Sequence, residues 1–163
     1  MFQMLKVRRA RKAAVALINP LVERSRWRFH GIPELVWLDP YLIGFLGMLI
    51  TLIAQREVRS IGGQALGLVQ LDAWEQITGT EIVNVGEEIC LLSANGDAAF
   101  QSGCVNAQQM FFAMEQERDV DAFSGDGNVS SAVDLQTTSV GQLWARYFEE
   151  RVLETGGPAI EAR

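Results

Sequence analysis

The sequence has almost no histidine, and this scarcity excludes several kinds of metal and acid–base site. His30 is the single histidine in 163 residues. Two-histidine zinc motifs and the Glu-x-x-His di-iron arrangement are therefore excluded. A serine triad would have to use His30, but neither a G-x-S-x-G turn nor a phosphate-binding G-x-x-x-x-G-K-[ST] loop occurs. We predict a non-catalytic protein without a cofactor or a metal; the alternative is an enzyme whose site carries no recognisable motif.

Cysteine is nearly as scarce. Cys90 and Cys104 are too few for a disulfide-stabilised secreted scaffold, and they lack the C-x-x-C spacing of a metal or redox pair. We interpret both as buried thiols in a reducing compartment, which favours a cytoplasmic location. Redox pairing of the two thiols is the alternative.

A long apolar run is missing as well. The longest, Tyr41–Ala54, has fourteen residues, which cover about 21 Å of a hydrocarbon layer about 30 Å thick. Extending it to residues 35–54 gives a sufficient length but includes Asp39 and Pro40. The favourable and unfavourable contributions to the free energy of membrane insertion then nearly cancel. We favour a buried core helix. The alternative is a membrane protein with a single span at about 35–54 and its N-terminus inside.

The pattern that is present is helical, and no strand-like alternation occurs. Asp39 and Pro40 are typical of a helix start, because the aspartate caps free N–H groups and a first-position proline loses no hydrogen bond. The sequence predicts an all-α, single-domain bundle of about five to six helices around a central hydrophobic helix at about 40–58. Gly44 and Gly47 would let a neighbouring helix approach this one closely.

Cap residues predict where the next helices begin and end. A helix over 64–78 carries one apolar stripe. Thr78 and Glu81 have the spacing of a capping box at the start of the helix that follows. Asn95 and Gly96 tolerate the left-handed backbone of a helix end, so we expect that helix to stop there.

Asp97 can cap the next helix, which runs to about residue 117 and should form an antiparallel hairpin with the helix before it. An acidic, turn-rich segment follows, and we expect a mobile loop over 118–138. Ser139 and Gln142 form a second capping box and open a last helix with a clean apolar stripe.

The first thirty residues differ from the rest in charge. Eight basic residues against one acidic residue give them +7, while the remainder carries −13 of the total of −6. Pro20 is expected to end a first helix near Ile18 or Asn19, with an irregular basic stretch after it. We therefore divide the chain into a basic arm (1–30), an acidic helical domain (31–155) and a tail (156–163).

A basic arm on an acidic body suggests a negatively charged contact. We expect a protein partner or self-association; an anionic membrane surface is the alternative, and the acidic body disfavours nucleic acid. Arginine and aromatic side chains are typical interface anchors. The predicted contact residues are Arg8, Arg9, Arg11, Lys12, Trp27 and Phe29.

The acidic loop partly matches a calcium-binding loop. The candidate cation ligands are Asp126, Asn128 and Asp134. Ser131 stands where such a loop needs glycine, and Thr137 where it needs a bidentate glutamate. Because the match is only partial, we predict no metal site and retain these three residues as weak candidates.

Overall fold

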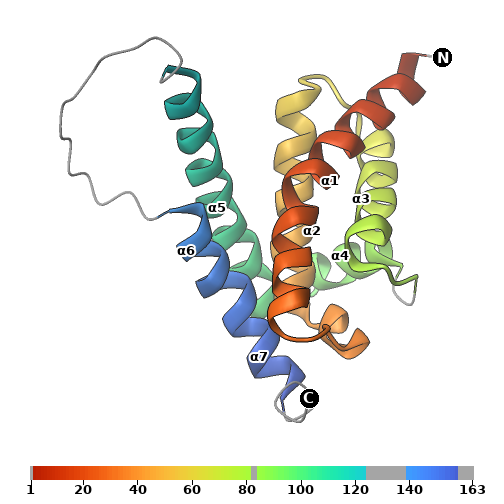
Figure 1. Cartoon of the computed structure of the whole chain (residues 1–163). Helices are drawn as coiled ribbons and strands as arrows, with labels where there is room; N and C mark the ends of the chain where they lie inside the picture. Colours follow the sequence, from red (N-terminus) through yellow and green to blue (C-terminus); the bar gives the residue numbers. More distant parts are fainter. Residues whose placement is uncertain (1, 82–83, 124–138, 158–163) are drawn as a thin grey trace.

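The computed structural model describes residues 2–81, 84–123 and 139–157, and every regular element within these ranges is a helix. The last three elements are continuous, so this part of the chain has six helices and one 3-10 turn, which confirms the predicted single-domain, all-α bundle (Figure 1). The elements are α1 (Phe2–Arg28), η1 (Glu34–Leu38), α2 (Pro40–Glu57), α3 (Gly63–Thr78), α4 (Val85–Ala94), α5 (Ala98–Phe123), α6 (Val140–Trp144), η2 (Ala145–Glu149) and α7 (Glu150–Gly156).

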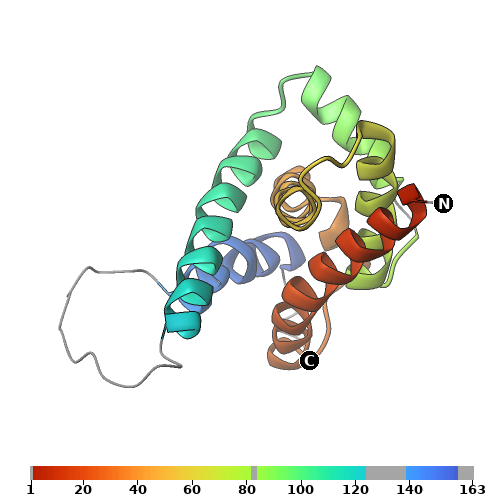
Figure 2. The same cartoon turned by 90° about the horizontal axis from the view of Figure 1, so that it is seen from above.

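α2 is the central helix, and the other helices surround it (Figure 2). Its start is capped as predicted, since the N–H of Leu42 donates to Asp39 Oδ1 at 3.2 Å. Phe45, Leu49 and Ile53 are fully buried; burial of each such side chain contributes about 1.5–3 kcal/mol. Among the described helices, none is long and apolar enough to cross a membrane.

α2 and α5 are in backbone contact, which two glycines make possible. A Cβ atom on Gly44 would lie 2.2 Å from the carbonyl oxygen of Phe100, and one on Gly103 would lie 2.1 Å from that of Tyr41. Any larger residue at either position would therefore push the two helices apart. The predicted close approach at Gly44 is confirmed, and it explains how α5 packs along α2.

α1 does not end near Pro20 as predicted; it continues to Arg28 without an irregular stretch. Pro20 is exposed, as is Ala16, whose carbonyl loses its usual backbone donor on the outer side of the helix. A proline inside a helix costs about 3 kcal/mol. Ile18 and Val22, which are fully buried on the inner side, together offset this, at about 1.5–3 kcal/mol each.

Thr78 does not cap the helix that follows it. It is the last residue of α3, and its hydroxyl donates to a carbonyl one turn earlier in the same helix. α4 begins only after Asn84, so the predicted capping box of Thr78 and Glu81 is wrong. The end of α3 is held instead by Arg26 of α1, which donates to the carbonyl oxygens of Ile77 and Thr78 at 2.9 and 2.7 Å.

α4 and α5 do not form the predicted antiparallel hairpin. Asp97 caps α5 as expected, since its Oδ1 accepts from the N–H of Phe100 at 2.8 Å. After this connection the two helices diverge, and α5 follows α2 instead (Figure 2). The physical reason is the glycine contact between α2 and α5, which gives α5 a closer neighbour than α4.

α5 is also longer than predicted, because residues 118–123 are helical rather than part of a loop. The remainder of the expected loop, 124–138, lies outside the described residues. The last helix starts with the predicted capping box: Ser139 Oγ accepts from the N–H of Gln142, and the Gln142 side chain accepts from the N–H of Ser139. It then passes through the π-helical turn η2 into α7.

Candidate functional site

Four predicted contact residues are cations of α1, and the structure separates them into two pairs. Arg9 and Arg11 form ion pairs with carboxylates of α2 and α3, at 2.6 and 3.2 Å. Arg8 and Lys12 are exposed and have no ion-pair partner within the described ranges. The acidic body thus neutralises part of the positive charge of α1 and leaves the rest available.

The two predicted aromatic contact residues lie in opposite environments. Trp27 is 82% exposed, the highest value among the large apolar side chains described, whereas Phe29 is 8% exposed and belongs to the core. Of the two, only Trp27 is therefore accessible at the surface. The signal that distinguishes them is helical phase, which becomes readable only because α1 continues past Pro20 to Arg28.

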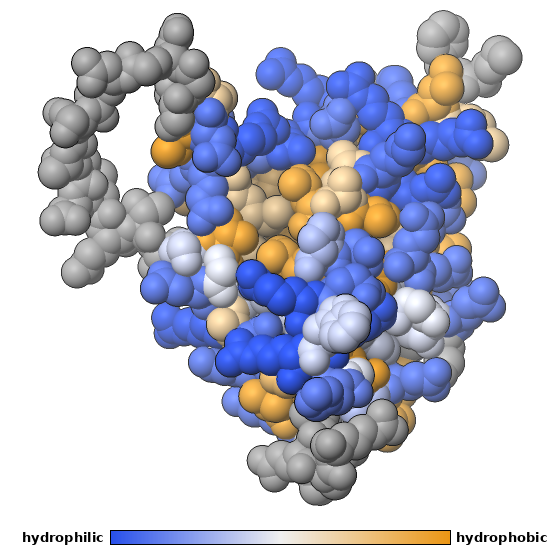
Figure 3. Space-filling model, in the orientation of Figure 1, coloured by the Kyte–Doolittle hydropathy of each residue, from blue (hydrophilic) through white to orange (hydrophobic). Residues whose placement is uncertain are grey.

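One exposed face runs along the whole of α1. We call it the α1 outer face; its residues are Arg8, Lys12, Ala16, Pro20, Arg24, Trp27 and Arg28. Basic residues stand at both of its ends, with small neutral residues between them. Figure 3 shows the side of the molecule across which α1 runs: hydrophobic surface lies in a hollow between α1 and the α5–α6 pair, with hydrophilic surface around it.

The C-terminal end of α1 is anchored by a buried carboxylate. Glu149, which is 4% exposed, accepts from the Ser25 hydroxyl at 2.8 Å and from Arg28 at 2.7 Å. The Trp144 indole N–H donates in turn to Ser25 Oγ at 2.9 Å. This network fixes the orientation of α1 against the last helix.

A second buried carboxylate lies at the start of α2. Asp39, 9% exposed, accepts from Nε and Nη2 of Arg151, the latter at 2.8 Å, and from the Thr155 hydroxyl at 3.0 Å. The Asp39 carboxylate raises the pKa of Arg151 above its usual range. We refer to Asp39 and Glu149 with their partners as the polar seam; the partners are Ser25, Arg28, Trp144, Arg151 and Thr155.

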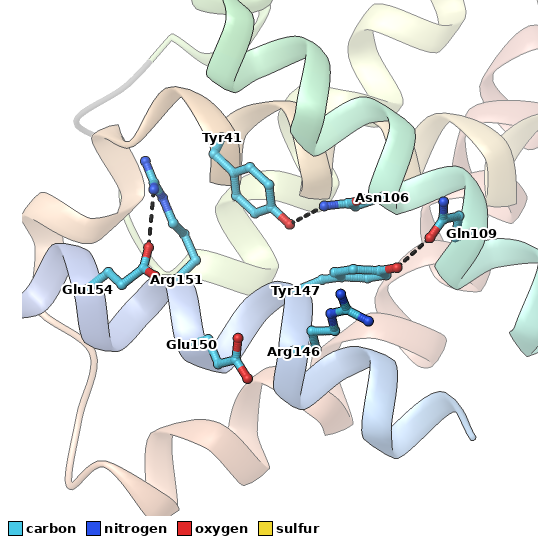
Figure 4. Close-up of a pocket in the computed structure, with 8 residues that line it drawn as sticks. All are labelled: Tyr41, Asn106, Gln109, Arg146, Tyr147, Glu150, Arg151 and Glu154. Atoms are coloured by element: carbon cyan, nitrogen blue, oxygen red, sulfur yellow. Dashed lines mark hydrogen bonds and ion pairs between the residues drawn. The ribbon is translucent and has the colours of Figure 1, made fainter. Parts of the chain in front are cut away.

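An open pocket of about 490 Å³ lies between α5 and the last helix (Figure 4). Its lining residues are Tyr41, Asn106, Gln109, Arg146, Tyr147, Glu150, Arg151 and Glu154. None of them was predicted as a site residue from the sequence. They come from three segments far apart in the chain, and the only sequence signal is the recurrence of polar residues at helical spacing on α5 and on the last helix.

The two tyrosines of the pocket are held by amide side chains of α5. The Asn106 amide donates to the Tyr41 hydroxyl at 2.9 Å, and the Tyr147 hydroxyl donates to Gln109 Oε1. Burial raises the pKa of Tyr41 above its ordinary value, so that its hydroxyl stays protonated at neutral pH. The guanidinium of Arg151 lies over the Tyr41 ring, 5.4 Å from its centroid.

The two cysteines are free and differ in exposure. Cys90 is exposed, so the prediction that both thiols are buried is wrong for it. It lines an open depression between α3 and α4, beside Leu68 and Leu91. Cys104 is half-buried beside the α2–α5 contact, where its Sγ donates to the Gly44 carbonyl at 3.6 Å. Burial raises the pKa of Cys104, which makes its thiol less reactive at neutral pH.

The described residues contain no group of three side chains that could hold a metal ion. The candidate cation ligands Asp126, Asn128 and Asp134 lie outside the described residues, so their prediction stays untested. Comparisons of the chain with protein-family models, with curated proteins and with solved structures gave no match.

Proposed function

We propose that the protein is a non-catalytic binding protein whose α1 outer face docks on an acidic surface of a protein partner. The observation that carries this proposal is Trp27, 82% exposed on a helix whose opposite side is packed into the core. Arg24 is exposed on the same face, as is Arg28, which is ion-paired with Glu149. Tryptophan and arginine are among the residue types most enriched at the energetic centres of protein interfaces.

The packing of α1 favours a protein partner over a membrane surface. A helix that lies in a membrane interface inserts its apolar side between lipids. The apolar side of α1 is already used, because Val7, Ala10, Ala14, Ile18 and Val22 are buried in the bundle. What remains for a partner is a polar face with one large aromatic side chain.

The charge distribution favours a protein over nucleic acid. Duplex binding needs many cations that each neutralise a phosphate. On α1 the ion pairs of Arg9 and Arg11 with the protein's own carboxylates reduce that number, and the rest of the chain is acidic. The hydrophobic hollow beside α1 in Figure 3 offers apolar contact area that a protein partner could cover.

The test compares the wild-type chain with a variant of the α1 outer face in affinity capture from cell extract. The variant combines Arg8→Glu, Lys12→Glu, Arg24→Glu and Trp27→Ala; these side chains are exposed, so helicity and the free energy of unfolding should change little. We expect proteins recovered by the wild type, or a second copy of the chain, to be lost with the variant. Arg118→Glu on α5, an exposed cation of another helix, is the control and should retain them.

Two results would contradict the proposal. One is equal recovery of every protein by the wild type and by the variant. The other is binding that occurs only with vesicles containing an anionic lipid, lost in the variant, with no protein captured by either chain. Sedimentation equilibrium of both chains distinguishes a second copy from a different partner.

A further inference from the structure

The pocket of Figure 4 has the size and lining of a site for a small polar molecule. Its volume of about 490 Å³ is within the range of about 300–1,000 Å³ usual for ligand pockets. Its rim residues Gln109, Arg146, Glu150 and Glu154 are exposed, so the pocket opens to solvent. Ordinary ligand pockets are mostly apolar, whereas this one is lined largely by polar and charged side chains.

The polar groups of the pocket fall into two sets: those already occupied and those that are free. Arg151 is bound to Asp39 and Glu154, and the Tyr147 hydroxyl donates to Gln109. The Tyr41 hydroxyl, in contrast, accepts its bond from Asn106 and so keeps its own hydrogen for another acceptor.

Arg146 and Glu150 are the free charged groups. In the described part of the chain neither has an ion-pair partner; the Arg146 guanidinium lies only over the Tyr147 ring, 5.9 Å from its centroid. Both belong to the last helix and stand one turn apart, which places their backbones about 6 Å from each other along the axis. Their side chains line the same pocket and are not paired with each other (Figure 4).

The balance of charge sets the class of ligand. The lining contains two arginines and two glutamates, so it favours neither an anion nor a cation overall. We propose that the pocket binds a small zwitterion of the α-amino acid class. Arg146 and the Tyr41 hydroxyl would hold its carboxylate, and Glu150 its ammonium group, so that each free charged group gains a partner.

The test screens the standard L-amino acids for binding to the full-length chain by saturation-transfer NMR, followed by calorimetry. We expect at least one to bind with a dissociation constant of about 1 mM or tighter. Arg146→Gln and Glu150→Gln should each weaken that binding about tenfold or more, as removal of a charge-assisted hydrogen bond predicts. The N-acetyl derivative, which lacks the ammonium group, and the carboxamide, which lacks the carboxylate, should show similar losses.

Arg59→Gln, an exposed cation that does not line the pocket, is the matched control and should bind like the wild type. The proposal is overturned if no standard amino acid binds even at a concentration of about 10 mM, ten times the expected dissociation constant. It is equally overturned if binding survives in both Gln variants or extends unchanged to the N-acetyl derivative. These readouts do not involve the α1 outer face, so they fail or succeed independently of the proposed docking function.

Discussion

The α2–α5 contact and the polar seam both join distant parts of the chain, but they differ in chemistry. At the first, two backbones touch through Gly44 and Gly103, and the buried apolar side chains of Phe45 and Phe100 lie beside them. At the second, the buried carboxylates Asp39 and Glu149 receive hydrogen bonds from the last helix and from α1. The α2–α5 contact depends on the absence of side-chain atoms at the two glycines, whereas the polar seam depends on the presence of particular hydrogen-bond donors.

This difference teaches how each region should respond to substitution. The glycine contact has no space for even one methyl group, and a backbone cannot rotate aside as a side chain can. The polar seam requires a hydrogen-bond donor for each buried carboxylate, and exact shape matters less. Loss of one partner leaves a buried polar group unsatisfied, while joint removal of both partners costs less.

The largest effect is expected from filling the glycine contact. Gly44→Ala and Gly103→Ala would place Cβ 2.2 and 2.1 Å from backbone oxygens, and each should lower the free energy of unfolding by about 3 kcal/mol or more. Gly67→Ala on α3 is the control, because nothing lies within 4 Å of its Cβ; alanine should stabilise that helix by up to about 1 kcal/mol. Urea denaturation followed by circular dichroism measures all three, and equal midpoints for Gly103→Ala and Gly67→Ala would refute the contact.

A smaller loss is expected when the polar seam loses its carboxylate. Glu149→Gln removes the charge that Arg28 binds and should reduce the free energy of unfolding by about 2 kcal/mol. Glu150→Gln, the exposed neighbour in the chain, should change it by no more than about 0.5 kcal/mol. The same urea titration measures both variants. If Glu149→Gln were as harmless as Glu150→Gln, the seam would contribute nothing to stability.

A smaller effect again separates two buried tryptophans. Trp144 donates its indole N–H to Ser25, whereas the indole N–H of Trp74 has no partner among the described residues. Both substitutions by phenylalanine remove the same atoms, so their difference isolates the hydrogen bond. We expect Trp144→Phe to cost about 1 kcal/mol more than Trp74→Phe in thermal or urea unfolding. The opposite order would show that Trp144 is held by packing alone.

Cysteine labelling tests the comparison without altering the protein's stability. Exposed Cys90 should react rapidly with a thiol reagent, whereas Cys104, beside the α2–α5 contact, should react slowly. Because burial raises the pKa of Cys104, its thiolate forms only at higher pH than that of an ordinary thiol, and its labelling rate should keep rising over that higher range. Mass spectrometry of peptic fragments measures the two rates; equal rates at neutral pH would mean that the contact opens freely.

The central helix α2 was largely predictable from the sequence, because its signals are local, whereas its pairing with α5 was not, since the sequence predicted a hairpin of α4 and α5. The apolar run, the Asp39 cap and the two glycines of α2 are all read within a single helix. The failures nearby have physical causes as well. The lost hydrogen bond of Pro20 is visible in the sequence, whereas the burial of Ile18 and Val22 that offsets it arises only in the tertiary structure.

The polar seam and the pocket could not be predicted, because their partners are far apart in the chain. Nothing in the local sequence links Ser25 to Glu149 or Asp39 to Arg151, since each pair forms only when the last helix packs against α1 and η1. The same holds for the α1 outer face: its cations were identified, but which of them pair with the body depends on how α1 lies on α3.

Native-state hydrogen exchange of α2 tests the central claim, that this apolar helix is enclosed by the other helices. In detergent-free buffer the amides of Phe45, Leu46 and Leu49, all fully buried, should exchange only through global unfolding, with an opening free energy equal to that from urea denaturation. Exchange of these amides through local openings that require less free energy than global unfolding, or protection that appears only when detergent is added, would contradict it.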